Sequence, residues 1–381
     1  MYIKETKKII NRIVEIAENG AVNHEIQNNV IAQVGGVHNL VIDDVERFKN
    51  TAKGIAKGCE DLGKSITFDE AMVKTAVATL LKDEEFENEQ TPLVLAQQLE
   101  KTTQYLKIQD FRDDPYIKNI KIKDTTVGDL KLFTDKLPAL TFITINSLLF
   151  KKSMYALPQI GFFDEELAYP MIKKIGAQDL YAVGPAEINT CKAAISNAKG
   201  KVLNLGLSLG YFAYMASLKD DVEKVTIVEN DKDLIELFKQ TILPQFEHPE
   251  KIEIVQKDSF EYLDGLQDKT FDYCFIDILK DEQEYLTYLK LKKLCHKFKK
   301  MQVCFKHEND IGIQLSNFVY IQMVNDCSRL MESFSQTEPP QLEGIDLEIF
   351  NIIKKAYSKV KITDSSDIDH YLHPKTIIKM L

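Results

Sequence analysis

From Lys201 onward the sequence alternates short apolar runs with helical stretches, and this alternation constrains the fold more than any other feature. The five runs are KVLNLG, KVTIVEN, KIEIVQKD, FDYCFID and MQVCFKH. Each is nearly continuous in apolar and β-branched residues, a pattern typical of strands that are buried on both faces. Strands that alternate with helices predict an α/β fold with a mostly parallel, doubly wound sheet.

The remainder of the chain shows mainly helical signals. Thr67 followed by Glu70 is the signature of a capped helix start, and the stretches QTPLVLAQQLEKTTQYL and TVGDLKLFTDKL are expected to be further helices. Pro185 is suited to begin a helix that Gly200 ends. Helical periodicity returns after His307. GFFDEELAYP (161–170) is read as a loop or short extended segment.

At 381 residues the chain exceeds the usual size of one hydrophobic core. We therefore expect a helical N-terminal domain, a connecting or lid segment, a sheet domain and a helical C-terminal extension, over residues 1–150, 151–197, 198–310 and 311–381.

Charge and cysteine usage narrow the classes of function. The chain has 48 Lys+Arg against 58 Asp+Glu, a net charge of −10, which argues against a nucleic-acid partner. The six cysteines are scattered without metal-ligand spacing. The start MYIKETKKII lacks the apolar core of a signal peptide, and the run at 139–150 is too short for a membrane helix. A cytoplasmic protein with no membrane partner is expected. The oligomeric state stays open, a homo-oligomer included.

The first predicted strand runs into a turn that is rich in small residues, GLSLG from Gly206 to Gly210. In a parallel sheet, ligands bind beyond the carboxyl ends of the strands, and glycines allow close backbone approach. The dinucleotide pattern GxGxxG would require a glycine where Tyr211 stands, so the spacing disfavours NAD.

The spacing instead resembles the first motif of class I S-adenosylmethionine-dependent methyltransferases, an acidic residue followed by GxGxG. The matching positions are Asn204, Gly206, Ser208 and Gly210. Asn204 stands where the family has an acid, and Ser208 where it has the middle glycine. The resemblance covers roughly residues 198 to 306 and implies a Rossmann-like sheet with S-adenosylmethionine as cofactor.

Three further strand ends match the family in order. Glu229 ends the second strand, where the resemblance implies a carboxylate that accepts both ribose hydroxyls. Asp258 and Ser259 follow the third strand, where it implies contact with the adenine edge. Asp277 ends the fourth, where it implies a group near the donor's amino group or the substrate. Taken singly, Glu229 reads as a solvated acid at a helix start, and Asp258 or Asp277 as a helix cap.

The catalytic residues are not identified by sequence. FIDILKDEQEYLTYL resembles the fourth motif of metal-dependent O-methyltransferases, with Lys280 and Tyr285 in place, but the second metal-binding aspartate is Leu279 and no metal is expected. Related aminopropyltransferases place a catalytic aspartate at the position of Lys280. The base-methylating signature, Asn or Asp before Pro-Pro-aromatic, is absent.

Other candidates have ordinary structural explanations. The lysine run 290–300 reads best as a solvated helix end. His296 and His307 are candidates for proton transfer, although surface or core histidines are commoner. The segment before the sheet could instead form a lid that brings substrate against a set of aromatic and acidic side chains, namely Phe162, Phe163, Asp164, Glu165 and Tyr169.

Three hypotheses follow. The leading one is a methyltransferase-like enzyme acting on an unidentified small-molecule acceptor. The second is a non-catalytic protein that binds S-adenosylmethionine or a related nucleoside, or serves as a scaffold, which Asn204 and Ser208 favour. The third is an aminopropyltransferase related to spermidine synthases, which fits the acidic charge but lacks the expected aspartate.

Overall fold

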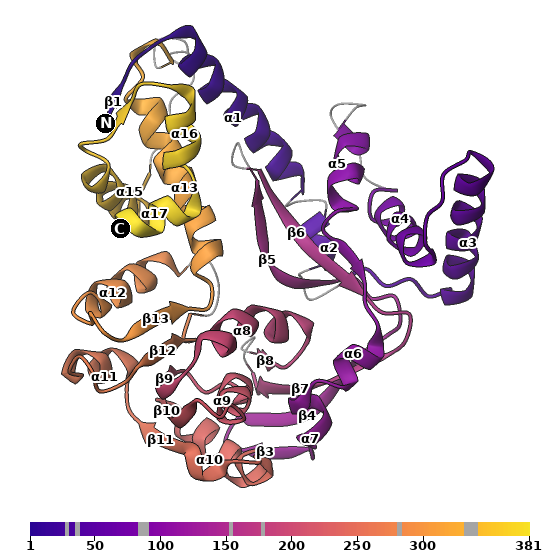
Figure 1. Ribbon diagram of the computed structural model, residues 1–381, viewed down its shortest axis with the longest axis vertical. Helices are drawn as coiled ribbons and strands as arrows, with labels where there is room; N and C mark the ends of the chain where they lie inside the picture. Colours follow the sequence, from indigo (N-terminus) through magenta and orange to yellow (C-terminus); the bar gives the residue numbers. More distant parts are fainter. Residues whose placement is uncertain are drawn as a thin grey trace.

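A computed structural model describes eight stretches of the chain, which are residues 1–26, 30–34, 39–82, 91–151, 155–176, 180–279, 284–330 and 342–381. Its centre is a five-stranded sheet in the order β11-β10-β9-β12-β13, in which every neighbouring pair is parallel (Figure 1). The strands are β9 (Gly200–Leu205), β10 (Val222–Glu229), β11 (Ile252–Gln256), β12 (Tyr273–Ile276) and β13 (Gln302–Phe305). All five predicted strands and their parallel arrangement are confirmed.

Helices cover both faces of this sheet because successive strand residues alternate between two cores. Val202 packs with α8, α9 and α10, whereas Leu203 and Leu205 pack on the opposite face with α11, α12 and α13. The helices are α8 (Pro185–Asn197), α9 (Tyr211–Ser217), α10 (Lys232–Thr241), α11 (Ser259–Gly265), α12 (Tyr285–Cys295) and α13 (Glu308–Asn325), with 3-10 turns at Leu243–Gln245 and Pro249–Lys251. The expected α/β class is therefore confirmed.

Local signals in the sequence explain where several helices begin. Pro185 occupies the first turn of α8, as predicted. Thr67 and Glu70 form a reciprocal capping box at the start of α4. The helices before the sheet are α1 (Lys7–Ile26), α2 (Ala32–Val34), α3 (Val45–Asp61), α4 (Phe68–Leu80), α5 (Thr91–Leu99), α6 (Ile108–Arg112) and α7 (Pro115–Asn119).

The prediction of a helix over TVGDLKLFTDKL is wrong. These residues form the antiparallel strands β3 (Thr125–Val127) and β4 (Leu130–Leu137), joined at Gly128, whose φ of 58° suits a tight turn. Leu130 and Leu132 are buried while Lys131 is exposed, which is the two-residue period of a strand. The segment before residue 150 is therefore not wholly helical.

Two small sheets precede the central one, in the orders β2-β6-β5 and β3-β4-β7-β8. Their remaining strands are β2 (Thr103–Tyr105), β5 (Ile143–Lys151), β6 (Tyr155–Phe162), β7 (Leu167–Lys174) and β8 (Leu180–Ala182). GFFDEELAYP thus joins β6 to β7, with extended residues at both ends of the connection. The four-stranded sheet packs beside α10.

The two ends of the chain lie together at one end of the molecule (Figure 1). Strand β1 (Tyr2–Ile3) pairs in parallel with β14 (Lys361–Ile362), and Arg12 of α1 donates to Asp369 of α16 at 3.1 Å. The C-terminal helices are α15 (Gly344–Ala356), α16 (Ser365–Tyr371) and α17 (Pro374–Met380). The predicted domain boundaries stay a prediction. Within the described ranges, no helix combines the length and apolarity needed to cross a membrane.

Candidate functional site

The predicted ligand turn joins β9 to α9 at the carboxyl edge of the sheet. Gly206, Ser208 and Gly210 all have positive φ, at 93°, 50° and 75°. A β-carbon on Gly206 would lie 2.3 Å from the backbone oxygen of Asp277, and one on Gly210 would lie 2.4 Å from the Phe238 ring. Protein packing alone therefore demands glycine at both positions.

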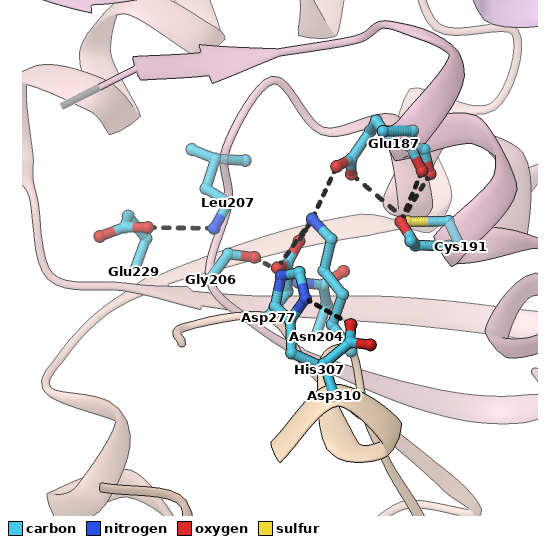
Figure 2. A network of polar contacts seen from close by, with 12 residues as sticks. Glu187, Cys191, Asn204, Gly206, Leu207, Glu229, Asp277, His307 and Asp310 are labelled. Atoms are coloured by element: carbon cyan, nitrogen blue, oxygen red, sulfur yellow. Dashed lines mark hydrogen bonds and ion pairs between the residues drawn. The ribbon is translucent and has the colours of Figure 1, made fainter. Parts of the chain in front are cut away.

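Glu229 points at this turn from the neighbouring strand (Figure 2). Its Oε2 accepts a hydrogen bond from the backbone N–H of Leu207 at 3.0 Å. Its Oε1 accepts from the N–H groups of Asn230 at 2.7 Å and Asp231 at 2.9 Å. A carboxylate offers about four acceptor positions. With three taken, the carboxylate keeps capacity for a further donor such as a hydroxyl.

Asn204 holds the turn from below. Its side-chain amide donates to the carbonyl of Gly206, and the residue is buried. An aspartate at this position could not donate to a carbonyl. The amide is therefore matched to the turn as it folds here, and the departure from the family's acidic residue has a structural explanation.

Asp258 and Ser259 lie at the end of the next strand along the same edge. Asp258 caps α11, since its Oδ1 accepts from the backbone N–H of Glu261 at 3.0 Å. Lys257 donates its N–H to the backbone oxygen of Glu229 at 3.1 Å, which ties the two strand ends together. Ser259 is buried in the first turn of α11. The helix-cap reading of Asp258 is thus realised, while an adenine contact stays a prediction.

Asp277 takes part in a buried ion network that the sequence did not indicate. The Lys306 ammonium lies 3.0 Å from Asp277 Oδ1 and 2.6 Å from Glu187 Oε2. The three side chains are only 10–13% exposed. Figure 2 shows Glu187 and Asp277 approaching from α8 and from the sheet edge. Cys191 Sγ lies 3.3 Å from Glu187 Oε1 and completes the network.

Burial raises the pKa of Asp277 to about 6, an effect that the Lys306 ammonium opposes and the Glu187 carboxylate reinforces. Burial by itself lowers the pKa of Lys306, but the two carboxylates outweigh it and the pKa is raised. Lys306 therefore stays protonated at neutral pH. The signal that could have found it is its place directly after strand β13, at the same edge as the predicted residues. Glu187 lies in a helix before the sheet and carries no such signal.

A second set of contacts fixes the turn from α7. The Tyr116 hydroxyl donates to the backbone oxygen of Leu209 at 2.6 Å, and the Tyr211 hydroxyl donates to Asp114 Oδ2 at 3.0 Å. Tyr116 is fully buried, and burial raises its pKa. Both tyrosines are thus neutral donors, and the turn is rigidly bounded on the side of α7.

The two histidine candidates have different surroundings. His307 precedes α13, and its Nδ1 lies 3.9 Å from Asp310 Oδ2. Asp310 in turn accepts from the backbone N–H of Leu148 in β5 at 2.9 Å. Figure 2 shows His307 beside Asp277. His296 is exposed at the end of α12, so of the two only His307 accompanies the predicted residues.

The lid prediction is not supported by the packing of residues 162–169. Phe162 and Phe163 are buried in two separate clusters, Asp164 pairs with Lys49 at 2.6 Å, and Tyr169 donates to Asp135 at 3.0 Å. Glu165 pairs with Arg112 at 3.2 Å. These side chains are engaged in local packing because their neighbours come from β4, α3 and α6.

The other sequence candidates do not join the site. Leu279 is buried in the core, Tyr285 packs edge-on against Phe318, and Lys280 lies outside the described residues. Within the lysine run, Lys292 donates to the Tyr288 hydroxyl at 2.9 Å. Among the described residues, no group of three His, Cys, Asp or Glu side chains could hold a metal ion.

No protein-family model and no curated protein matches the chain. Three solved structures resemble part of it. A spermidine synthase from Thermotoga maritima is 18% identical with a TM-score of 0.28, over 41% of this chain and 60% of that one. A precorrin 8W decarboxylase from Methanobacterium thermoautotrophicum is 14% identical with a TM-score of 0.25, over 32% of this chain and 64% of that one.

A spermidine synthase in complex with the transition-state analogue AdoDATO is 14% identical with a TM-score of 0.29, over 49% of this chain and 84% of that one. The chain thus spans less than two thirds of the length of the first two structures. At such TM-scores the similarity concerns the fold alone and carries no functional argument.

Proposed function

We propose that the chain is a methyltransferase-like protein whose Rossmann-like sheet binds S-adenosylmethionine, or a nucleoside related to it, at the carboxyl edge of β9, β10 and β12. The observation that supports this most is the Glu229 carboxylate, which faces the glycine turn and bonds the Leu207 N–H at 3.0 Å. A carboxylate one strand over from a side-chain-poor turn is suited to the vicinal hydroxyls of a ribose.

The residues fit the nucleoside part of such a ligand better than its charged part. Glu229 retains an acceptor position after its three backbone hydrogen bonds. At the other end of the site, Asn204 is uncharged and Asp277 is paired with Lys306. S-adenosylmethionine, when bound, supplies an activated methyl group. This chain's residues would bind the sugar and keep the turn rigid.

The acceptor in this proposal is a small molecule of unidentified class. Methyl transfer depends mainly on aligning the reacting atoms, so it does not require a dedicated general base. The alternative of a non-catalytic nucleoside-binding protein is favoured by one specific observation, namely that the Asp277 carboxylate is already bound to Lys306. The two functions share the same ligand site and are separated by turnover.

Calorimetric titration with S-adenosylmethionine and with its demethylated thioether tests the site. Glu229→Gln removes the charge that favours hydroxyl donors and should weaken binding at least about tenfold, since hydrogen bonds to charged groups contribute about 1.5–3 kcal/mol. Glu223→Gln, an exposed carboxylate on the same strand, is the matched control and should bind normally. Circular dichroism would verify that both variants fold.

Failure of the wild-type chain to bind either nucleoside would refute the proposal and favour the scaffold reading. If decarboxylated S-adenosylmethionine bound far more tightly than the parent compound, the aminopropyltransferase reading would replace it. Equal binding by wild type and Glu229→Gln would show that the ligand lies elsewhere.

A further inference from the structure

The charge of the candidate site is set by a lysine of the chain itself. The Lys306 ammonium lies 3.0 Å and 3.1 Å from the two oxygens of Asp277. It also lies 2.6 Å from Glu187 Oε2. A cation held by two carboxylates from different elements, with about a tenth of its side chain exposed, is fixed in place. The strand end that would face a ligand's charged atoms therefore already contains a positive charge.

The neighbouring strand end adds no compensating negative charge. Asn204 is neutral, buried, and spends its amide on the Gly206 carbonyl. Asp277 is the acid next to the turn, because its backbone oxygen lies against Gly206. With Asp277 neutralised by Lys306, Glu229 is the carboxylate that still faces the turn, and it lies at the position suited to the sugar.

A methyl donor and its product differ at one atom. The donor carries a positively charged sulfonium, whereas the product is an uncharged thioether. A negative charge near the sulfur favours the donor, and a positive charge opposes it. Where a lysine cancels the nearest carboxylate, the electrostatic advantage of the donor disappears.

We propose that Lys306 sets the ligand preference of this edge, so that the site takes uncharged thioether nucleosides at least as well as the sulfonium donor. This inference rests on the nucleoside site proposed above. It identifies the ligand class as adenine thioether nucleosides and makes Lys306 a specificity-determining residue through its contact with Asp277. The His307 and Glu187 side chains face the same group and leave this assignment unchanged, because both are present in every variant compared.

The test compares the dissociation constants of S-adenosylmethionine and its demethylated thioether, measured by calorimetry as a ratio within each variant. Wild type should bind the thioether at least as tightly as the sulfonium. Lys306→Met frees Asp277 and should shift the ratio toward the sulfonium by about tenfold or more, as expected for a unit charge in a partly buried site. Asp277→Asn leaves the lysine charge uncancelled and should shift the ratio in the opposite direction.

The two variants protect the test against misfolding. Asp277→Asn is nearly isosteric and keeps the Lys306–Glu187 pair, so it remains informative if Lys306→Met does not fold. Lys251→Met is the matched control, because Lys251 donates to the carbonyls of Ser217 at 3.0 Å and Lys219 at 2.9 Å beyond the opposite edge of the sheet. Its ratio should equal that of wild type.

The outcomes separate this inference from the proposed function. Opposite shifts in the two charge variants, with an unchanged control, support the role of Lys306. A tenfold preference of wild type for the sulfonium, or equal ratios in all variants, would overturn the inference and leave the nucleoside site intact. Absence of binding by either ligand to wild type would remove both.

Discussion

Replacing Gly206 by alanine tests the geometry on which the site depends. The residue has a φ of 93°, which L side chains rarely adopt, so a β-carbon costs about 1–2 kcal/mol in backbone strain. That β-carbon would also lie 2.3 Å from the Asp277 backbone oxygen, whereas real β-carbon contacts are not shorter than about 3.0 Å. The two groups must separate by at least about 0.7 Å, the difference between these distances.

That separation is opposed by the sheet itself. Asp277 donates its N–H to the backbone oxygen of Leu205 at 2.8 Å, and its side chain is held by Lys306. Overpacking of this kind costs about 1–3 kcal/mol. Strain and overpacking together predict that Gly206→Ala lowers the free energy of unfolding by about 3 kcal/mol.

Gly63→Ala is the control. Gly63 has a similar φ of 74° but no atom within 4 Å of an added β-carbon, so only the strain of about 1–2 kcal/mol applies. Urea unfolding followed by circular dichroism gives both values, and calorimetry of Gly206→Val should show nucleoside binding at least about tenfold weaker. Equal destabilisation by the two alanine variants would refute the close approach of β9 and β12 at the turn.

Three further predictions concern stability. Tyr116→Phe removes the buried hydrogen bond to the Leu209 carbonyl and should lower the free energy of urea unfolding by about 1–2 kcal/mol; no loss would mean that water satisfies this carbonyl. Because burial raises the pKa of Asp277 from 3.8 to about 6, the folded state retains a proton that the unfolded chain releases. Stability should therefore fall as pH rises from about 4 to 6, and Asp277→Asn should flatten that part of the profile in thermal melts; a slope that persists in the variant would contradict the assignment. Ile3→Ala removes a buried side chain from the strand paired with Ile362 and should cost about 2 kcal/mol in the same unfolding assay, whereas an unchanged midpoint would show that the chain ends do not contribute.

The sequence predicted the central sheet well because its strands carry their own signal. Runs such as KVTIVE are apolar on both sides and lie between helices, and that pattern has few alternative folds. The segment from Thr125 to Leu137 was less readable. Val127, Leu130, Phe133 and Leu137 are spaced much as on a helix, and pairing with β7, about forty residues later, decides for a strand.

The candidate site divides in the same way. Glu229 could be placed because the end of a strand fixes where its side chain lies relative to the next turn. The ion network could not, because Glu187 and Lys306 are 119 positions apart and meet only when α8 packs on the sheet. Asp277 was found at the correct edge, but its partner changes its chemistry from a free acid to half of an ion pair.

The contact between the two chain ends sets an order of assembly. Arg12 hydrogen-bonds to a residue 357 positions later in the sequence. At synthesis rates of about 5–20 residues per second, roughly 20 to 70 seconds separate the emergence of α1 from that of α16. During this interval the apolar side of α1, with Ile9 and Ile13, lacks the C-terminal helices that later pack around it. The helix made first is therefore among the last to find its place, and nascent chains of this protein should depend on chaperones until residues 361–381 have left the ribosome.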